Sequence, residues 1–492
     1  MRAPFGKLSW LAAFAAMGVL AGGPAYGADE KEEEPQKDSK EVRTAKQLHV
    51  MFTQQMGVHQ DVELQDYVQR VGEKLAAVSG RPELDWHFTI VDTDDVNAFA
   101  TMGGYVYISR GILPYFQNEA DLAAVLGHEI GHIDAEHLKK QNRKGMLSGL
   151  ASAATAIFTG MPALADLTNM AGQAIISGYG REAELEADRL GAEYLRAAGY
   201  DPEAMIRVIS TLKDQDTFER ERARLEKREP RLYHGVFSTH PSNDTRLQQA
   251  VASAGGRSTA AAAGNTANRE GFLRAIEGLP VGSSARQGMV VENRFYHSDM
   301  QFTLAFPRGW QIVNQPDKIL GIAPNKDHFM EIRTQAPPAD LTNPRDFAMR
   351  GLGNRRLERP ETLDINGLKA WTAIVRGDAS PYGKSTNVRY IIIYYGNLMW
   401  VFKGASRSGT AAPAGDPFFL STANTFRRMR PNEFALAEPH RLHVMRAGEG
   451  TTMEALAKDA PIKKYPLQQI RLFNGLYPDG EPKPGDLVKT VR

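Results

Sequence analysis

The chain has 492 residues, a formal net charge of +1 and no cysteine. At roughly 100–200 residues per domain, this length predicts two to four domains, and the 42% hydrophobic and 24% charged residues are typical of a folded protein. The near-zero charge argues against a nucleic-acid partner. The lack of cysteine excludes disulfides, thiol nucleophiles and cysteine-ligated metals, so any metal must be held by His, Asp and Glu.

Residues 1–27 predict a secretory signal peptide. Arg2 and Lys7 are basic, residues 8–20 are apolar, and Ala25-Tyr26-Gly27 has the small-x-small pattern of a cleavage site. An uncleaved membrane anchor is the alternative, but the apolar run is short and is followed by two glycines and a proline. We therefore expect export, to a bacterial periplasm, with residues 28–43 forming a charged, solvated tail.

A single helix is predicted over residues 118–140 (NEADLAAVLGHEIGHIDAEHLKK), with Asn118 as its N-cap. It contains His128-Glu129-x-x-His132. Residues i and i+4 share one helix face, so both imidazoles can converge on one metal, with Glu129 beside them as a general base. The apolar surroundings predict a buried helix, and Gly127 and Gly131 indicate close approach by another segment.

A catalytic zinc usually has a third protein ligand. The metzincin extension is excluded because Ala135 and Leu138 occupy its positions and His137 is predicted on a different helix face from His132. A second helix, over residues 181–200, could supply a glutamate and complete a His₂Glu site. Its first two turns carry the acidic residues Glu182, Glu184, Glu186 and Asp188. Spacing alone does not choose among them, and a solvated acidic face is the alternative.

Four motifs in order resemble metallopeptidase family 48, with its HExxH…ExxxD signature. In chain order they are NAFATMGGYVYISRG at 97–111, HEIGH at 128–132, ELEAD at 184–188 and THPSNDTR at 239–246. The resemblance covers about residues 44–250. It implies a mainly α, zincin-like metallopeptidase domain with a small β-sheet, at 44–251.

The resemblance also implies roles for individual residues. His128, His132 and Glu184 would bind one zinc ion per chain, and Glu129 would be the general base. Asp188 would orient a ligand histidine. His240 would face the metal, where it could stabilise an oxyanion or act as a reversible fourth ligand.

Two further segments near this site are interpreted from pattern. Residues 103–109 (GGYVYIS) predict an edge strand, and in the resembled family such a strand pairs with extended substrate. Residues 145–165 carry no charge but include Gly149, Gly160 and Pro162. We interpret them as a mobile helical lid, with a membrane span as the alternative.

The rest of the chain predicts a linker and two smaller units. Residues 252–284 are the linker, rich in small residues. Residues 285–432 predict an α+β domain with an antiparallel sheet, including a hairpin at Gly396-Asn397, and weakly resemble the PsbP/Mog-like fold. Residues 436–492 resemble a small α+β LysM module, which implies peptidoglycan contact.

The whole pattern predicts an exported zinc-dependent metalloendopeptidase. The resemblance implies unfolded or misassembled envelope proteins as substrates, in protein quality control. One alternative is a non-enzymatic adaptor that docks to the cell wall and holds a structural zinc, although such a site would not need Glu129. Another is a zinc hydrolase of cell-wall peptides.

Overall fold

The computed structural model describes residues 40–142, 180–226, 268–284, 287–315 and 317–492. The predicted signal peptide, residues 28–39 of the predicted tail, the predicted lid and His240 lie outside them. Residues 40–43 of the predicted tail are the first residues of a helix. In the described ranges, no helix is both long enough and apolar enough to cross a bilayer.

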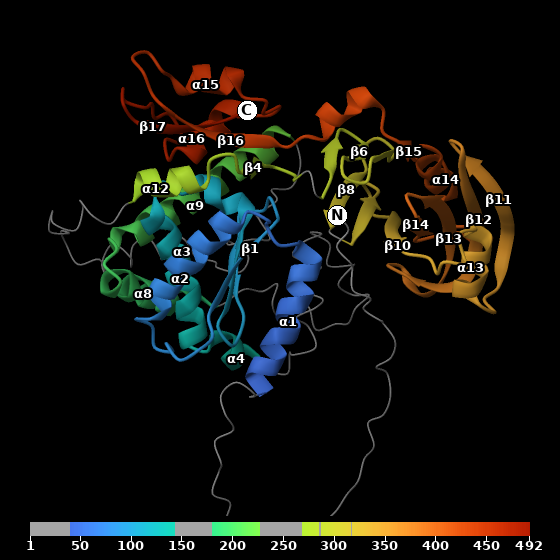
Figure 1. Cartoon of the computed structure of the whole chain (residues 1–492), viewed down its shortest axis with the longest axis horizontal. Helices are drawn as coiled ribbons and strands as arrows, with labels where there is room; N and C mark the ends of the chain where they lie inside the picture. Colours follow the sequence, from blue (N-terminus) through green and yellow to red (C-terminus); the bar gives the residue numbers. More distant parts are fainter. Residues whose placement is uncertain (1–39, 143–179, 227–267, 285–286, 316) are drawn as a thin grey trace, which may run out of the picture. The chain divides into compact units, whose positions relative to one another are not determined.

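The N-terminal part is mainly helical around a small sheet (Figure 1). Its elements are α1 Lys40–Met56, α2 Val62–Ala76, β1 His87–Val91, β2 Ala98–Ala100, β3 Tyr105–Ser109, η2 Arg110–Tyr115, α3 Glu119–Asp134, α4 His137–Asn142, α8 Arg181–Ala197 and α9 Glu203–Leu225. The sheet order is β1-β3-β2, with β3 parallel to β1 and antiparallel to β2.

The prediction of an edge strand at residues 103–109 is wrong. β3 is the central strand, and all five of its residues are buried. Its tyrosines, Tyr105 and Tyr107, pack with apolar residues of α1, while Val106 and Ile108 belong to the main apolar cluster that includes α3. Both faces of the strand are therefore covered, and the two edges of this three-stranded sheet are formed by β1 and β2.

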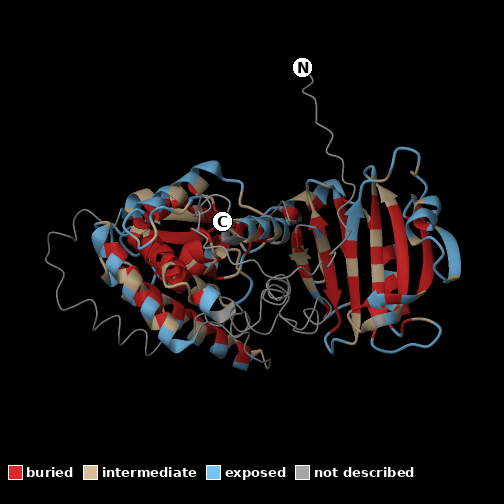
Figure 2. Ribbon diagram, turned by 90° about the horizontal axis from the view of Figure 1, so that it is seen from below, coloured by how far each residue is buried: buried red, intermediate tan, exposed pale blue. Residues whose placement is uncertain are grey.

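The middle part contains two antiparallel sheets. Its elements are β5 Met289–Val291, β6 Arg294–His297, β7 Phe302–Ala305, β8 Gln311–Gln315, β9 Lys318–Ile322, β10 His328–Gln335, α13 Pro344–Leu352, β11 Leu357–Ile365, β12 Leu368–Ser380, β13 Gly383–Tyr395, β14 Leu398–Ser406, α14 Asp416–Asn424 and β15 Arg427–Arg428. The larger sheet has the order β11-β12-β13-β14-β10-β9-β8 and the smaller has β15-β7-β6-β5. Long stretches of the larger sheet's strands are buried (Figure 2).

The predicted hairpin in this part is confirmed. β13 and β14 pair up to Tyr395 and Leu398, and the two residues between them, Gly396 and Asn397, have φ angles of 61° and 63°. These left-handed values are those of a type I′ turn, whose twist matches that of the flanking strands. The antiparallel sheet predicted for residues 285–432 is likewise observed.

Two elements of the predicted linker combine with the C-terminal elements, and one of them, β4, joins a small C-terminal sheet. The linker elements are α12 Arg269–Ala275 and β4 Pro280–Val281. The C-terminal elements are η4 Pro431–Ala437, β16 His440–Arg446, α15 Met453–Asp459, α16 Pro466–Phe473 and β17 Leu487–Val491. β16 pairs antiparallel with both β17 and β4. The described end of the predicted linker, residues 268–284, is thus structured rather than an irregular connection.

These C-terminal elements share the apolar core of the helical part. Leu442, Phe473 and Val491 belong to the same buried cluster as Leu122 and Leu126 of α3. The cluster therefore joins segments more than 300 positions apart in the chain.

A buried lysine adds polar contacts to this junction. Lys489 of β17 is fully buried, and its Nζ donates to the carbonyl oxygens of Pro114 (2.8 Å) and Phe116 (2.5 Å). Arg269 donates to the carbonyls of Gln117 (2.7 Å) and Leu487 (2.8 Å). The segment that leads into α3 is therefore held by the last strand of the chain.

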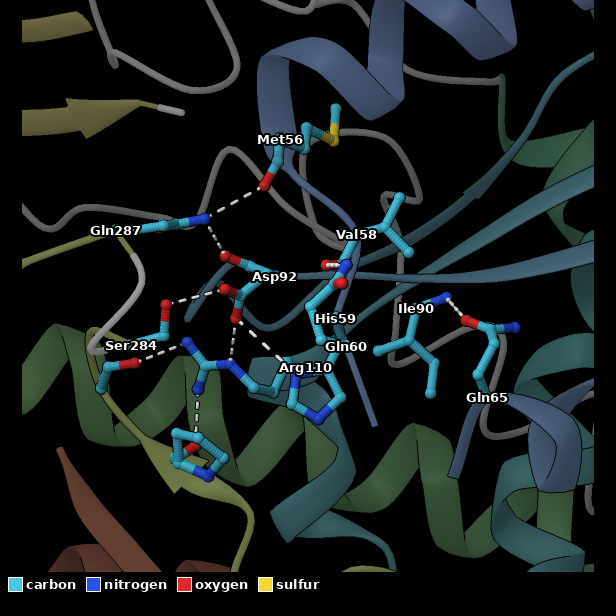
Figure 3. A network of polar contacts seen from close by, with 12 residues as sticks. Met56, Val58, His59, Gln60, Gln65, Ile90, Asp92, Arg110, Ser284 and Gln287 are labelled. Carbon is cyan, nitrogen blue, oxygen red and sulfur yellow. Dashed lines mark hydrogen bonds and ion pairs between the residues drawn. The ribbon is translucent and has the colours of Figure 1, made fainter. Parts of the chain in front are cut away.

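A second polar network joins Pro280, Gly282, Ser284 and Gln287 to Asp92, which follows β1, and to Arg110 of η2 (Figure 3). The Asp92 carboxylate accepts from Arg110 Nε and Ser284 Oγ, each at 2.7 Å. Arg110 also donates to the carbonyls of Pro280 (2.5 Å) and Gly282 (2.7 Å). Burial acts to raise the pKa of Asp92, but His59, Arg110 and Ser284 outweigh it and lower that pKa to about 2.

Candidate metal centre

Helix α3 begins where its sequence predicts. The Asn118 side chain accepts a hydrogen bond from the Asp121 backbone N–H at 3.1 Å, which caps the first turn. Every residue from Ala120 to Ile133 is buried. His128, Glu129 and His132 are therefore held inside the protein, with 5%, 2% and 2% of their surfaces exposed. Buried polar groups of this kind need partners to offset the loss of water.

Helix α8 approaches α3 closely, as the glycines of α3 predict. A Cβ atom on Gly131 would lie 3.0 Å from the carbonyl oxygen of Ala187, and one on Gly127 would lie 3.4 Å from that of Gly191. On α8, a Cβ on Gly191 would lie 3.0 Å from the backbone nitrogen of His128. The three glycines let the two backbones come close enough for side chains of α8 to reach the histidines.

The orientation of α8 selects among its acidic residues. Its buried positions are Glu184, Ala187, Asp188, Gly191, Tyr194 and Leu195, which follow the spacing of one helix face. Glu182 and Glu186 are both exposed. Only Glu184 and Asp188, among the four acidic residues from 182 to 188, therefore lie on the face toward α3.

The structure brings together the three predicted ligands. His128 Nε2 and His132 Nε2 are 3.0 Å apart, and they lie 3.7 Å and 3.5 Å from the two Glu184 carboxylate oxygens. In the described part of the chain, these residues form a buried group that could hold a metal ion. Donors placed roughly 2.0–2.1 Å from a tetrahedral zinc would be about 3.3 Å apart. The observed separations bracket this value, and two imidazoles with a carboxylate are a donor set that suits zinc.

Asp188 lies beside the first of these histidines. Its Oδ1 is 2.8 Å from Nδ1 of His128, the nitrogen that faces away from Glu184. A carboxylate in this position accepts the Nδ1 hydrogen and leaves Nε2 with a lone pair for a metal. This is the geometry that the orienting role suggested for Asp188 would need.

His137 is placed differently from its prediction. The helix predicted over 118–140 breaks after Asp134, because Glu136 has a left-handed φ of 52° and α4 starts in a new direction at His137. His137 Nδ1 consequently lies 2.8 Å from His132 Nδ1, and its Nε2 lies 3.1 Å from Glu186 Oε2. Burial lowers the pKa of His137, against the opposing effect of Glu186. Sequence reasoning missed this pair, since a left-handed glutamate gives no local signal.

Comparison with known proteins bears on the same region. Residues 63–254 match the model of peptidase family M48. A "Beta-barrel assembly-enhancing protease" from Yersinia pestis is 33% identical over 200 residues, 39% of each chain. The protein of that name from Escherichia coli (strain K12) is 32% identical over 200 residues, also 39% of each chain. The "Mitochondrial metalloendopeptidase OMA1" of Arabidopsis thaliana is 31% identical over 172 residues, 35% of this chain and 32% of that one.

The match with the first two relatives therefore spans 39% of their length. The solution structure of cyanobacterial PsbP from Synechocystis sp. PCC 6803 aligns with 29% of this chain and 95% of its own, at 15% identity and a TM-score of 0.22.

Proposed function

Residues 63–254 belong to peptidase family M48, and from this we propose that the protein is an exported zinc metalloendopeptidase. The observation that carries the proposal is the buried group of His128, His132 and Glu184, whose donor atoms all lie within 4.8 Å of one another. Zinc bound there would supply a Lewis acid that polarises a peptide carbonyl and lowers the pKa of a water molecule.

The remaining chemistry belongs to the protein's own side chains. Glu129 follows His128 in the buried helix α3 and is not needed to complete a His₂Glu ligand set. We assign it the role of general base: its carboxylate takes a proton from the attacking water and returns it to the leaving amine nitrogen. Asp188 holds His128 through Nδ1. We retain His240, outside the described residues, as the group that steadies the oxyanion or caps the metal.

We propose that β2, and not the central strand β3, is the edge strand that pairs with extended substrate. β2 pairs with β3 through Ala98↔Ile108, Phe99↔Tyr107 and Ala100↔Val106, and it ends the sheet. Ser109 N donates to the Asn97 carbonyl and Thr101 N donates to that of Tyr105, so the alternation directs the backbone groups of Ala98 and Ala100 away from β3. We propose that an extended substrate adds to the sheet at these two residues.

We propose that the enzyme acts in the periplasm, because a signal peptide is predicted at residues 1–27. Two relatives are named for β-barrel assembly, and we propose by analogy that this enzyme cleaves unfolded or misassembled envelope proteins. Contact of residues 436–492 with peptidoglycan stays a prediction: β16, α15, α16 and β17 follow one another there, but much of their apolar surface packs into the core shared with α3.

The decisive experiment compares the wild-type protein with Glu129→Gln. Both are assayed for cleavage of an unfolded protein such as casein, and their zinc content is measured. We expect both to bind one zinc ion and only the wild type to cleave, since the amide cannot accept the proton. Glu182→Gln, an exposed position on α8, is the control and should cleave normally. Equal cleavage by wild type and Glu129→Gln would refute the assignment of the base.

A further inference from the structure

We infer that His137 and Glu186 form a positioning pair that fixes the ring and the hydrogen of His132, through a chain of two hydrogen bonds that runs from the metal site toward the protein surface. The inference rests on the proposed metal site. It concerns residues outside the HExxH…ExxxD signature.

The backbone makes this contact by a change of direction. α3 ends at Asp134, whose Oδ2 accepts hydrogen bonds from Gly80 N (2.6 Å) and Tyr194 Oη (2.5 Å). Glu136 then adopts φ 52°, and α4 begins at His137. In a continuous helix, the fifth residue after His132 would point well away from it. The break instead brings the two rings to a centroid distance of 5.0 Å, at an interplanar angle of 68°.

The direction of each hydrogen bond follows from the metal-facing atom of His132. Its Nε2 lies 3.5 Å from Glu184 Oε1 and 3.0 Å from His128 Nε2, so Nε2 is the atom that would bind a metal. A metal-binding nitrogen presents a lone pair, and a neutral imidazole then carries its hydrogen on Nδ1.

That hydrogen has a nearby acceptor in His137. The two Nδ1 atoms are 2.8 Å apart, so His132 donates and His137 must accept. A neutral His137 that accepts at Nδ1 carries its own hydrogen on Nε2. Nε2 lies 3.1 Å from Glu186 Oε2, which accepts it. Each nitrogen in this series of hydrogen bonds therefore has one role, as donor or as acceptor, and the series ends at the Glu186 carboxylate.

The two metal-facing histidines are consequently supported in different ways by the same helix. Asp188 of α8 contacts His128 directly, whereas Glu186 of α8 reaches His132 through His137. The His137 side chain is 4% exposed, and that of Glu186 is 44% exposed. Loss of the buried acceptor should matter more than loss of the half-exposed carboxylate, because solvent can partly replace the latter.

The test measures zinc affinity in the full chain by competition with a chromogenic chelator, without any activity assay. His137→Leu replaces the imidazole with an apolar side chain of similar size and removes the acceptor, and we expect zinc affinity to fall about 10- to 100-fold, as for other partners of metal ligands. His137→Gln offers a carbonyl oxygen and should recover most of this loss. Glu186→Ala should weaken binding by about threefold or more.

Glu193→Ala is the matched control for Glu186→Ala. Glu193 also lies on α8, has a side chain 50% exposed and pairs with Arg189 at 2.6 Å. It should leave zinc affinity unchanged. If His137→Leu does not fold, the two alanine variants decide, and equal affinities would overturn the inference. If the wild type binds zinc and His137→Leu binds it with the same affinity, the inference about His137 and Glu186 is refuted while the proposed metal site stands. A wild type that binds no zinc would overturn the proposed metal site as well.

Discussion

The close approach of α3 and α8 beside the metal site leads to a prediction about Gly131, for which Gly127 provides the control. Gly127 and Gly131 lie one turn apart in α3, and both face α8. Replacing either by alanine gains about 1 kcal/mol of helix propensity. A Cβ at position 127 would meet the carbonyl oxygen of Gly191 at 3.4 Å, an ordinary contact distance. Gly127→Ala should therefore stabilise the protein by up to about 1 kcal/mol.

Gly131→Ala should behave in the opposite way. Its Cβ would lie 3.0 Å from the Ala187 carbonyl oxygen and 3.1 Å from the Ala187 Cα, which are backbone atoms that cannot rotate away. Overpacking of this kind costs about 1–3 kcal/mol, enough to cancel or exceed the gain in propensity. To restore ordinary contact, α8 must move by about 0.4 Å, more than the roughly 0.2 Å tolerance of a metal–ligand distance. Glu184 is one turn away on α8, so zinc affinity should fall about tenfold.

The assay is urea unfolding of both variants without metal, followed by chelator competition for zinc. We expect Gly131→Ala to be about 1–3 kcal/mol less stable than Gly127→Ala and to be the weaker zinc binder. Equal stability and equal zinc affinity of the two variants would refute the argument that glycine at 131 is required by the approach of α8.

Two further predictions concern buried charges outside the metal site. Burial lowers the pKa of Lys489 well below 10.5, so the folded state disfavours its protonated form and stability should rise with pH toward the unfolded-state pKa of about 10.4. Urea unfolding between pH 8 and 10 should show this rise in wild type relative to Lys489→Met, and parallel curves would contradict it. The pKa of Asp92 is lowered to about 2, so this group contributes about 2 kcal/mol above pH 4 that is lost as pH falls toward 2. The stability margin of wild type over Asp92→Asn should shrink over that interval, and a constant margin would count against the network around Arg110.

Features set by neighbouring residues were predictable from the sequence. The Asn118 cap, the shared face of His128 and His132, and the turn at Gly396-Asn397 each depend on a few consecutive residues. Close approach of another segment to α3 was also predictable, because glycine in a buried helix lowers helix propensity, but the glycines did not identify that segment as α8.

Features set by long-range packing were not predictable. The pattern of residues 103–109 predicts an edge strand, but β3 lies between β1 and β2 and is covered by α1. No local pattern predicts the burial of Lys489, because its acceptor Pro114 is 375 positions away. His137 depended on a left-handed Glu136, a conformation that side chains other than Gly, Asn and Asp rarely adopt.

The pairing of β4 with β16 also indicates which segments of the chain could be removed with the core intact and which could not. Val281 and His440 are opposite each other in the register, and neighbouring strands are only about 4.8 Å apart. Among the described residues between Leu279 and Leu442, only Val281 packs against the buried cluster around α3. The middle domain is thus an insertion whose entry and exit adjoin, so residues 282–439 could be replaced by a tight turn with that core intact. Trimming the chain to the family-matched residues 63–254 would instead remove α12, β4, β16 and β17, and would expose the apolar residues that pack against them in the shared cluster.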